Sequence, residues 1–257
     1  MKLSRRIALG GQQLDEVDAA VVIRSIDTGA TKETVQAVAM MGGSGQRMTG
    51  RHWDTIDVSV NYAINIPKKR LAERRAVFDA VNAWAMAKGW LTVNYMTGRR
   101  LCVDHVTLPS SADLWEWAEE FTITFRAYAV PFWQDTTATV STGASITVPG
   151  MVETVCDAEL TNGSGSTVDD LTLTIGTSSF VFTNLGLGNG KKLKIGHQND
   201  GTLYIRRYTG DATFVSAMDK RTGGSSDDLY AMPGARTITV SASGVTWSVS
   251  CRGRYAG

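Results

Sequence analysis

One short stretch of the sequence brings three chemically active side chains together. Cys102, Asp104 and His105 could supply a thiolate nucleophile with its base, or the ligands of a metal ion. The residues around them alternate as in a β-strand, so Cys102 and Asp104 should share one face while His105 points to the other. A cysteine and a histidine on opposite faces cannot converge without a bulge. We therefore expect a buried structural cysteine here and no catalytic site.

Carboxylates and the other histidines give no better constellation. Four acids stand before a predicted strand at a loose spacing that is typical of a solvated turn, although paired acids can hydrolyse glycosides: Asp113, Glu116, Glu119 and Glu120. Asp227 and Asp228 lack the alternating oxygen ligands of a calcium loop. His52 and His197 have no partner at a ligand spacing. We expect no catalytic residue, no metal site and no cofactor.

Residues 42–50, GGSGQRMTG, form a glycine-rich segment that we expect to be a long loop. It has no Gly-Lys-Ser/Thr ending and leads into a strand at Asp54, so no helix N-terminus would face a phosphate. Two hypotheses remain, an arm that contacts a partner or a mobile loop. For the arm, methionines and neighbouring residues give adaptable interface contacts. The candidates are Met40, Met41, Arg47, Met48, Arg51 and Trp53.

A helix should follow Pro67, because no further glycine or proline occurs before Gly89. Its apolar face would carry Leu71, Phe78, Val81 and Ala85. Its solvent-exposed face would carry the charged residues: Lys68, Lys69, Arg70, Glu73, Arg74, Arg75 and Asp79. Cations at a helix start are disfavoured by the helix dipole. Carboxylates of a neighbouring subunit, or Glu73 and Asp79 of the same chain, should offset them. Arg74 and Arg75 complete the subunit-interface candidates.

The first half should be a β-sheet or barrel-like domain with this helix on its flank. Strands are expected around 7–9, 21–26, 34–41, 54–64 and 121–128, and a hairpin over 91–105 that turns at Gly98. Residues 134–145 are small and polar and predict a linker or interdomain strand. We place the domains at 1–137 and 138–257.

The second half shows short alternating runs between turn residues, which predict a β-sandwich of the jelly-roll or galectin-like type. We expect strands at 146–148, 152–160, 171–175, 179–183, 192–195, 203–206, 237–241 and 245–251. Asn162-Gly163, Asn189-Gly190 and Asp200-Gly201 should form tight turns. Cys156 and Cys251 fall on the second and last of these strands and could be neighbours. A disulfide between them is geometrically possible, but three sparse cysteines are typical of a reducing compartment.

Composition excludes several classes of protein. The formal charge is +1, from 26 Lys and Arg against 25 Asp and Glu, so neither half has the basic excess of a duplex DNA binder. The N-terminus has no apolar core of a secretion signal, and no run approaches the length of a transmembrane span. We expect a protein that folds in a cytoplasm.

The order of elements and several segments resemble the distal tail protein (Dit) family of siphophages. In the first half these are the Trp-rich acidic turn Leu114-Trp115-Glu116-Trp117 and the strand that runs into Pro131-Phe132-Trp133. In the second half they are ITVPGMVETVCDAELTNGSG, LTLTIG, KLKIG and LYAMPGARTITVSASG. The resemblance covers nearly the whole chain. The chain has no room for the inserted carbohydrate-binding module of larger members.

The resemblance implies a structural virion protein with no enzymatic activity. Six copies would form a hub ring that joins the tail tube to the tail-tip or baseplate apparatus. The ring would contact the tail tube protein and a tail-associated hub protein, and the tape-measure protein and DNA would pass its channel without specific binding. The protein would be assembled in the host cytoplasm, reside at the virion tail tip and contact no membrane. The alternatives are a tail tube or terminator subunit, or a sandwich that binds host-surface glycan through aromatic residues: Tyr204, Tyr208, Tyr230, Trp247 and Tyr255.

Overall fold

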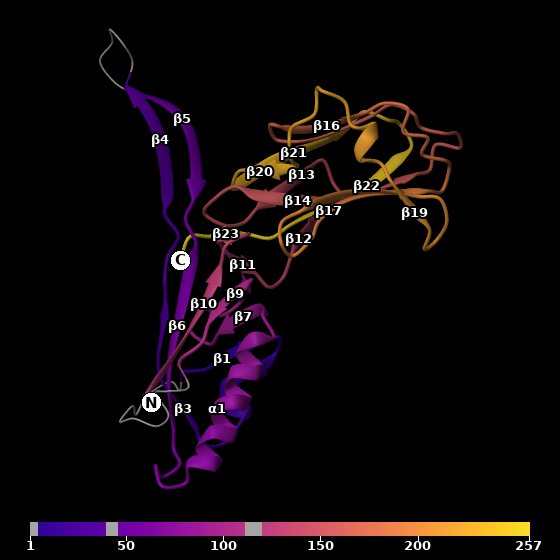
Figure 1. Cartoon of the computed structure of the whole chain (residues 1–257). Coiled ribbons are helices and arrows are strands. Elements are labelled where there is room, and N and C mark those ends of the chain that lie inside the picture. The colour runs from indigo at the N-terminus through magenta and orange to yellow at the C-terminus, as the bar shows by residue number, and fades with distance from the viewer. Residues whose placement is uncertain (1–4, 40–45, 111–119) are drawn as a thin grey trace. The chain divides into compact units, whose positions relative to one another are not determined.

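The chain folds into two compact units that are built mainly from β-strands. A computed structural model describes residues 5–39, 46–110 and 120–257. Unit 1 comprises residues 1–133 together with 256–257, and unit 2 comprises residues 134–255. The described residues contain a single α-helix, which belongs to unit 1 (Figure 1). No helix within this part of the chain has the length and apolar character that a membrane crossing requires.

A four-stranded antiparallel sheet forms the centre of unit 1. Its order is β3 (Val21–Thr28), β6 (Ile56–Ile64), β10 (Phe121–Ala127) and β9 (His105–Thr107). Every second residue of β6 from Ile56 to Tyr62 is buried, as is every second residue of β10. This alternation is the period of a strand with one face in the core, and it confirms both strands as predicted.

A second sheet of unit 1 contains the predicted hairpin. Here β2 (Gln12–Gln13), β1 (Ile7–Leu9), β7 (Gly89–Val93) and β8 (Arg99–Val103) lie in this order. A short 3-10 helix, η1 (Leu14–Glu16), follows β2. β7 and β8 pair antiparallel with Leu91 opposite Leu101. Gly98 has a φ of 78° in the turn between them, a conformation that favours glycine.

Helix α1 (Leu71–Met86) packs its apolar side against the central sheet. Phe78 meets Phe121 edge-on at 5.4 Å between ring centroids, and Trp84 meets Phe125 at 5.7 Å. Val81 between them is fully buried. Each contact joins a helix residue to β10, so the aromatic residues of the helix and the strand form one core.

Unit 2 is a sandwich of two antiparallel sheets, as the sequence predicts. One sheet has the order β12 (Thr139–Ser141), β22 (Val245–Cys251), β14 (Thr154–Asn162), β17 (Lys192–His197), β18 (Leu203–Tyr208) and β19 (Phe214–Ser216), with β20 (Tyr230–Ala231) also paired to β14. The other has the order β13 (Ser145–Val148), β21 (Gly234–Val240), β15 (Leu171–Ile175) and β16 (Ser178–Phe182). The short elements β11 (Trp133–Asp135), η3 (Met218–Lys220) and β23 (Arg254–Tyr255) complete the described strands and helices.

The core of the sandwich consists of the inward side chains of both sheets. Phe180 and Phe182 of β16, Leu160 of β14 and Val249 of β22 are fully buried. All eight strands predicted for this half are present. The structure adds β19 and β20, whose two or three residues are too few to show a period. β12 lies within residues 134–145, for which the sequence predicts a linker or interdomain strand. Of the three predicted turn glycines, Gly190 and Gly201 have positive φ, while Gly163 does not.

Candidate functional site: an exposed hairpin arm

Two strands of unit 1 form a hairpin of their own, which we call the arm. It consists of β4 (Glu33–Ala39) and β5 (Gln46–Trp53), paired antiparallel from Glu33 opposite Trp53 to Ala39 opposite Gln46. The register shifts by one residue between Gln36 and Ala37. Figure 1 shows β4 and β5 running as a separate two-stranded ribbon beyond the ends of β3 and β6.

The described side chains of β4 face water. Every residue of β4 from Glu33 to Val38 is exposed, and Val35 and Val38 keep 50% and 59% of their surface accessible. Among the described strands, β4 and β5 pair only with each other. Each therefore presents an open edge of backbone N–H and C=O groups, and such an edge can pair with another chain. An isolated two-stranded hairpin is only marginally stable in water.

The base of the arm is fixed by several contacts within unit 1. The Trp53 ring lies edge-on to Phe132, with 5.2 Å between centroids. The backbone N–H of Asp54 donates to the Lys32 carbonyl at 2.9 Å, and the Thr34 hydroxyl donates to the Asp54 carboxylate at 3.1 Å. The Thr31 hydroxyl donates to the Asp54 carbonyl. The base of the arm is thus anchored in unit 1, while the ribbon beyond it is exposed.

Four of the eight predicted interface residues belong to this arm: Arg47, Met48, Arg51 and Trp53. Met40 and Met41 lie outside the described residues. Arg47, Met48 and Arg51 lie on β5, opposite Val38, Ala37 and Val35 of β4. The prediction of a long loop over 42–50 is wrong from Gln46 onward, because residues 46–50 pair as a strand even though Gly50 is among them. That these residues contact a neighbouring subunit stays a prediction.

The prediction that Arg74 lies on the solvent-exposed face of the helix is wrong. Its side chain is only 4% exposed, and its Nη1 donates to the carbonyls of Ile64 at 3.3 Å and Ile66 at 2.9 Å. The reason is its position: Arg74 precedes the buried Phe78 by one helical turn and so shares its face. The Arg74 side chain therefore binds backbone carbonyls in the interior of its own subunit.

The exposed face of the helix offsets its charge within the chain. Arg75 pairs with Asp79 at 3.8 Å, and Arg70 pairs with Glu73 at 3.4 Å. All four side chains are more than half exposed, so each pair contributes little to stability. Two cations of the helix thus pair with carboxylates of the same chain. That a neighbouring subunit supplies carboxylates as well stays a prediction.

The chemically suggestive cysteine stretch is divided between the two sheets of unit 1. Cys102 lies in β8, whereas His105 begins β9, so the predicted single strand ends earlier than expected. Asp104 causes the break, because its carboxylate accepts the backbone N–H groups of Tyr128 and Ala129 at 3.0 and 2.8 Å. Cys102 is half-buried, where full burial was expected.

Of the four acids that precede β10, only Glu120 lies within the described residues. Asp113, Glu116 and Glu119 lie outside the described residues, and Glu120 is exposed with Arg24 at 3.8 Å. Across residues 5–39, 46–110 and 120–257, no group of three His, Cys, Asp or Glu side chains is arranged to hold a metal ion.

Unit 2 contains a histidine cluster that the sequence does not reveal. His197 of β17 contacts Asp157 of β14 through Nδ1 and Asp228 through Nε2, both at 2.8 Å. Burial alone would lower the pKa of His197, but the two hydrogen bonds and the charges of both carboxylates outweigh it and raise the pKa to about 9. The imidazole is therefore protonated at neutral pH and donates from both nitrogens, so it cannot act as a general base. No local pattern signals this cluster, because its members are far apart in sequence.

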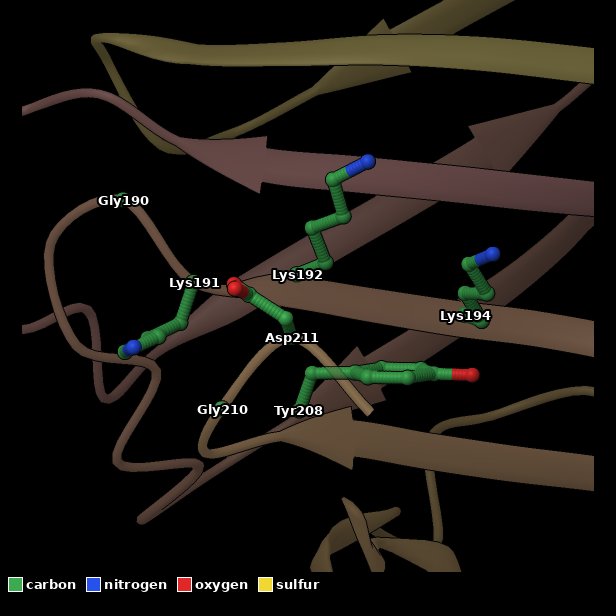
Figure 2. Close-up of a pocket in the computed structure, with 7 residues that line it drawn as sticks. All are labelled: Gly190, Lys191, Lys192, Lys194, Tyr208, Gly210 and Asp211. Atoms are coloured by element: carbon green, nitrogen blue, oxygen red, sulfur yellow. The ribbon is translucent and has the colours of Figure 1, made fainter. Parts of the chain in front are cut away.

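The outer face of the same sheet bears on the glycan alternative. A cavity of about 270 Å³ lies there. Among its lining residues, Figure 2 shows Tyr208 beside Lys194, with Lys191, Lys192 and Asp211 around them. The Lys194 amine lies 5.4 Å from the centre of the Tyr208 ring, and Arg206 stacks 4.4 Å from the centre of the Tyr204 ring. Cations of the protein thus already occupy the ring faces that a sugar would stack on.

Sequence comparisons find no relative of the chain. No protein-family model matches it. No curated protein matches it.

Solved structures do match the fold. The crystal structure of the SPP1 Dit protein, described as a paradigm of the hub adsorption apparatus in phages that infect Gram-positive bacteria, aligns with a TM-score of 0.64 and 12% sequence identity. The alignment covers 97% of this chain and 98% of SPP1 Dit. Baseplate structures of phage P2 in its activated conformation, with Ca and with Sr, align with TM-scores of 0.45 and 0.46 at 9% identity, over 96% of this chain and 97% of theirs. These two similarities are too weak to carry a fold assignment. The chain therefore has the fold of SPP1 Dit along nearly its whole length, as its resemblance to distal tail proteins predicts.

Proposed function

We propose that the chain is a structural distal tail protein, the hub that joins a siphophage tail tube to the tail-tip apparatus. In this proposal six copies form a ring at the tail tip of the virion. The tape-measure protein and then the DNA pass through its channel. The tail tube protein lies on one side of the ring and a tail-associated hub protein on the other, and the subunits assemble in the host cytoplasm.

The observation that carries the proposal is the similarity to SPP1 Dit over both units. A similarity confined to unit 2 would fit any protein with a β-sandwich, a fold that serves many functions. Here the alignment takes in 97% of the chain and leaves 2% of SPP1 Dit uncovered. Both units therefore have a counterpart along nearly the whole length of SPP1 Dit.

The arm supports assembly through repeated contacts. Its open strand edges and the exposed Val35 and Val38 belong to a segment that cannot bury apolar surface on its own. A closed ring of identical subunits joins one surface of each chain to a different surface of the next. We propose that the arm is one of these two surfaces, with Arg47, Met48 and Arg51 of β5 taking part.

The near-neutral charge suits a channel that DNA passes. The whole chain carries +1, and strong phosphate binding requires clustered Lys and Arg. The described residues also present no catalytic constellation, which fits a structural role.

The first experiment is the solution mass of the purified chain by light scattering, with electron microscopy of the main species. We expect a mass near six times 27.7 kDa and ring-shaped particles. If the free chain is monomeric, the same measurement is repeated after mixing with purified tail tubes. A chain that stays monomeric and unbound in both conditions contradicts the proposal.

The arm is tested by replacing Val35 and Val38 together with lysine. The double variant should remain a folded monomer, because two charges on each arm repel and cannot be buried against the next subunit. The matched control is Val140→Lys in β12 of unit 2, since Val140 is also a strand valine and is 60% exposed. If both proteins assemble equally, the arm is not part of the interface.

The glycan alternative predicts a different outcome. A sandwich that binds host-surface sugar would retain the carbohydrate in a glycan array as a monomer, and Tyr208→Ala would abolish retention. We expect no retained glycan, because cations cover the Tyr204 and Tyr208 rings. A tail tube or terminator subunit would form rings that do not attach to the tip end of a tail.

A further inference from the structure

Two cysteines of unit 2 face each other across neighbouring strands. In the register of β14 and β22, Cys156 lies directly opposite Cys251. The N–H of Cys156 points away from β22 and donates to the carbonyl of Leu229 at 2.8 Å. Because the N–H and C=O of a strand residue point to the same side, Cys156 and Cys251 form a non-hydrogen-bonded pair.

This type of pair has the spacing that a disulfide needs. The Cα atoms of a non-hydrogen-bonded antiparallel pair are about 4.5 Å apart, closer than those of a hydrogen-bonded pair. Disulfides join Cα atoms that are about 4.4–6.8 Å apart. Both side chains also point to the same face of the sheet, since directly opposed residues do so. The register therefore places the two Cα atoms at a spacing within the range that a disulfide spans.

The surroundings favour this pairing over any other. Cys156 and Cys251 are both buried in the core of the sandwich, with 0% and 3% of their surface exposed. The hydrogen bond with Cys156 lowers the pKa of the Cys251 thiol, while the same bond and burial raise the pKa of Cys156. The third cysteine, Cys102, lies in unit 1. Each thiol of the pair therefore has the other as its immediate neighbour.

We propose that Cys156 and Cys251 are an oxidation site that forms a disulfide between β14 and β22 when the protein meets a small disulfide oxidant. The Cys251 thiolate attacks one sulfur of the oxidant, forms a mixed disulfide and releases one thiolate. The Cys156 thiolate then attacks the protein sulfur of this mixed disulfide and releases the second. Two protein thiols become one disulfide, and the two protons that they lose are taken up by the two released thiolates, so the oxidant leaves as two thiols.

The bond would fasten the centre of the larger sheet. β14 and β22 are its adjacent inner strands, and the loop that the bond closes contains β15 to β21, which is most of unit 2. Closing a long loop restricts the unfolded chain and so stabilises the folded one. A protein made in a reducing cytoplasm and released outside the cell would gain this stability only after release. The site does not depend on the proposed tail function.

The test compares the reduced chain with the chain treated with oxidised glutathione, both in the native state and during refolding from urea. We expect the free thiols to fall from three to one and the intact mass to fall by two hydrogen atoms. Proteolysis without reductant should yield a peptide that links Cys156 to Cys251. The midpoint of thermal unfolding should rise on oxidation and return on reduction.

Two variants separate the pair from the remaining thiol. Cys102→Ser should keep the linked peptide and the rise in the midpoint, whereas Cys156→Ser should lose both. The proposal is overturned if both thiols stay free in the native and the refolded samples. It is equally overturned if Cys102 takes part in the bond, or if the bond forms without raising the midpoint.

Discussion

The protonated His197 makes the stability of unit 2 depend on pH in a defined window. Its imidazole is 6% exposed and lies between the carboxylates of Asp157 and Asp228. The pKa rises from 6.5 to about 9 on folding. A group whose pKa is higher in the folded state contributes its full stabilisation below the unfolded pKa. That stabilisation falls as the pH rises from 6.5 to about 9 and is absent above.

The size of the effect follows from the two pKa values. Each pKa unit corresponds to about 1.4 kcal/mol, so the full rise would give about 3 kcal/mol. Asp157 keeps 53% of its side chain exposed, and water screens its attraction to the imidazolium. We therefore expect the free energy of unfolding to fall by about 2 kcal/mol across this window.

The assay compares the wild type with His197→Gln by urea unfolding at several pH values from below 6.5 to above 9. The stability difference between the two proteins should shrink as the pH rises. His52→Gln is the control, because His52 is more than half exposed and lies 3.7 Å from Asp54. The chain has three histidines, so NMR can follow each imidazole directly. A His197 signal that titrates at or below 6.5, or a difference that stays constant with pH, would refute the reasoning.

Two further predictions concern buried polar groups. Arg74→Ala should lower the free energy of unfolding by about 2–3 kcal/mol, because two backbone carbonyls lose their donor, whereas Arg75→Ala on the exposed face should cost less than about 0.5 kcal/mol. Equal losses in urea unfolding would contradict this. Asn162→Ala should cost about 2–4 kcal/mol, since the fully buried Asn162 amide donates to two carbonyls and accepts a backbone N–H. Asn189→Ala, an exposed asparagine with one such bond, should stay within about 1 kcal/mol in the same measurement.

The sequence predicted the elements whose local pattern is strong. β6 and β10 alternate over seven residues or more, and α1 is bounded by Pro67 and Gly89, so type and position could be read without tertiary information. The eight longer strands of unit 2 follow for the same reason. β19 and β20 could not be predicted, since pairing with a neighbour defines them and their own residues carry no period.

The candidate site was predicted in part. Because arginine is charged, Arg74 was predicted on the solvent-exposed face of the helix. Arg74 lies one helical turn before Phe78, and this position, not the residue type, decides that it is buried. The glycine at position 50 favours a loop over 46–50, yet pairing with β4 overrides that weak preference. His197 could not be foreseen at all, because Asp157 and Asp228 reach it only through the pairing of distant strands.

The anchored base of the arm has a consequence for the geometry of any head-to-tail assembly. Such contacts close into a ring only if the rotation from one subunit to the next divides a full circle; otherwise they grow into an open helical filament. The direction in which the arm leaves unit 1 is held by the edge-on contact of Trp53 with Phe132 and by the bonds around Asp54. In the proposed hub these few contacts would set that rotation. A smaller side chain at Trp53 would then alter the symmetry of the particle while leaving the strength of each contact nearly unchanged.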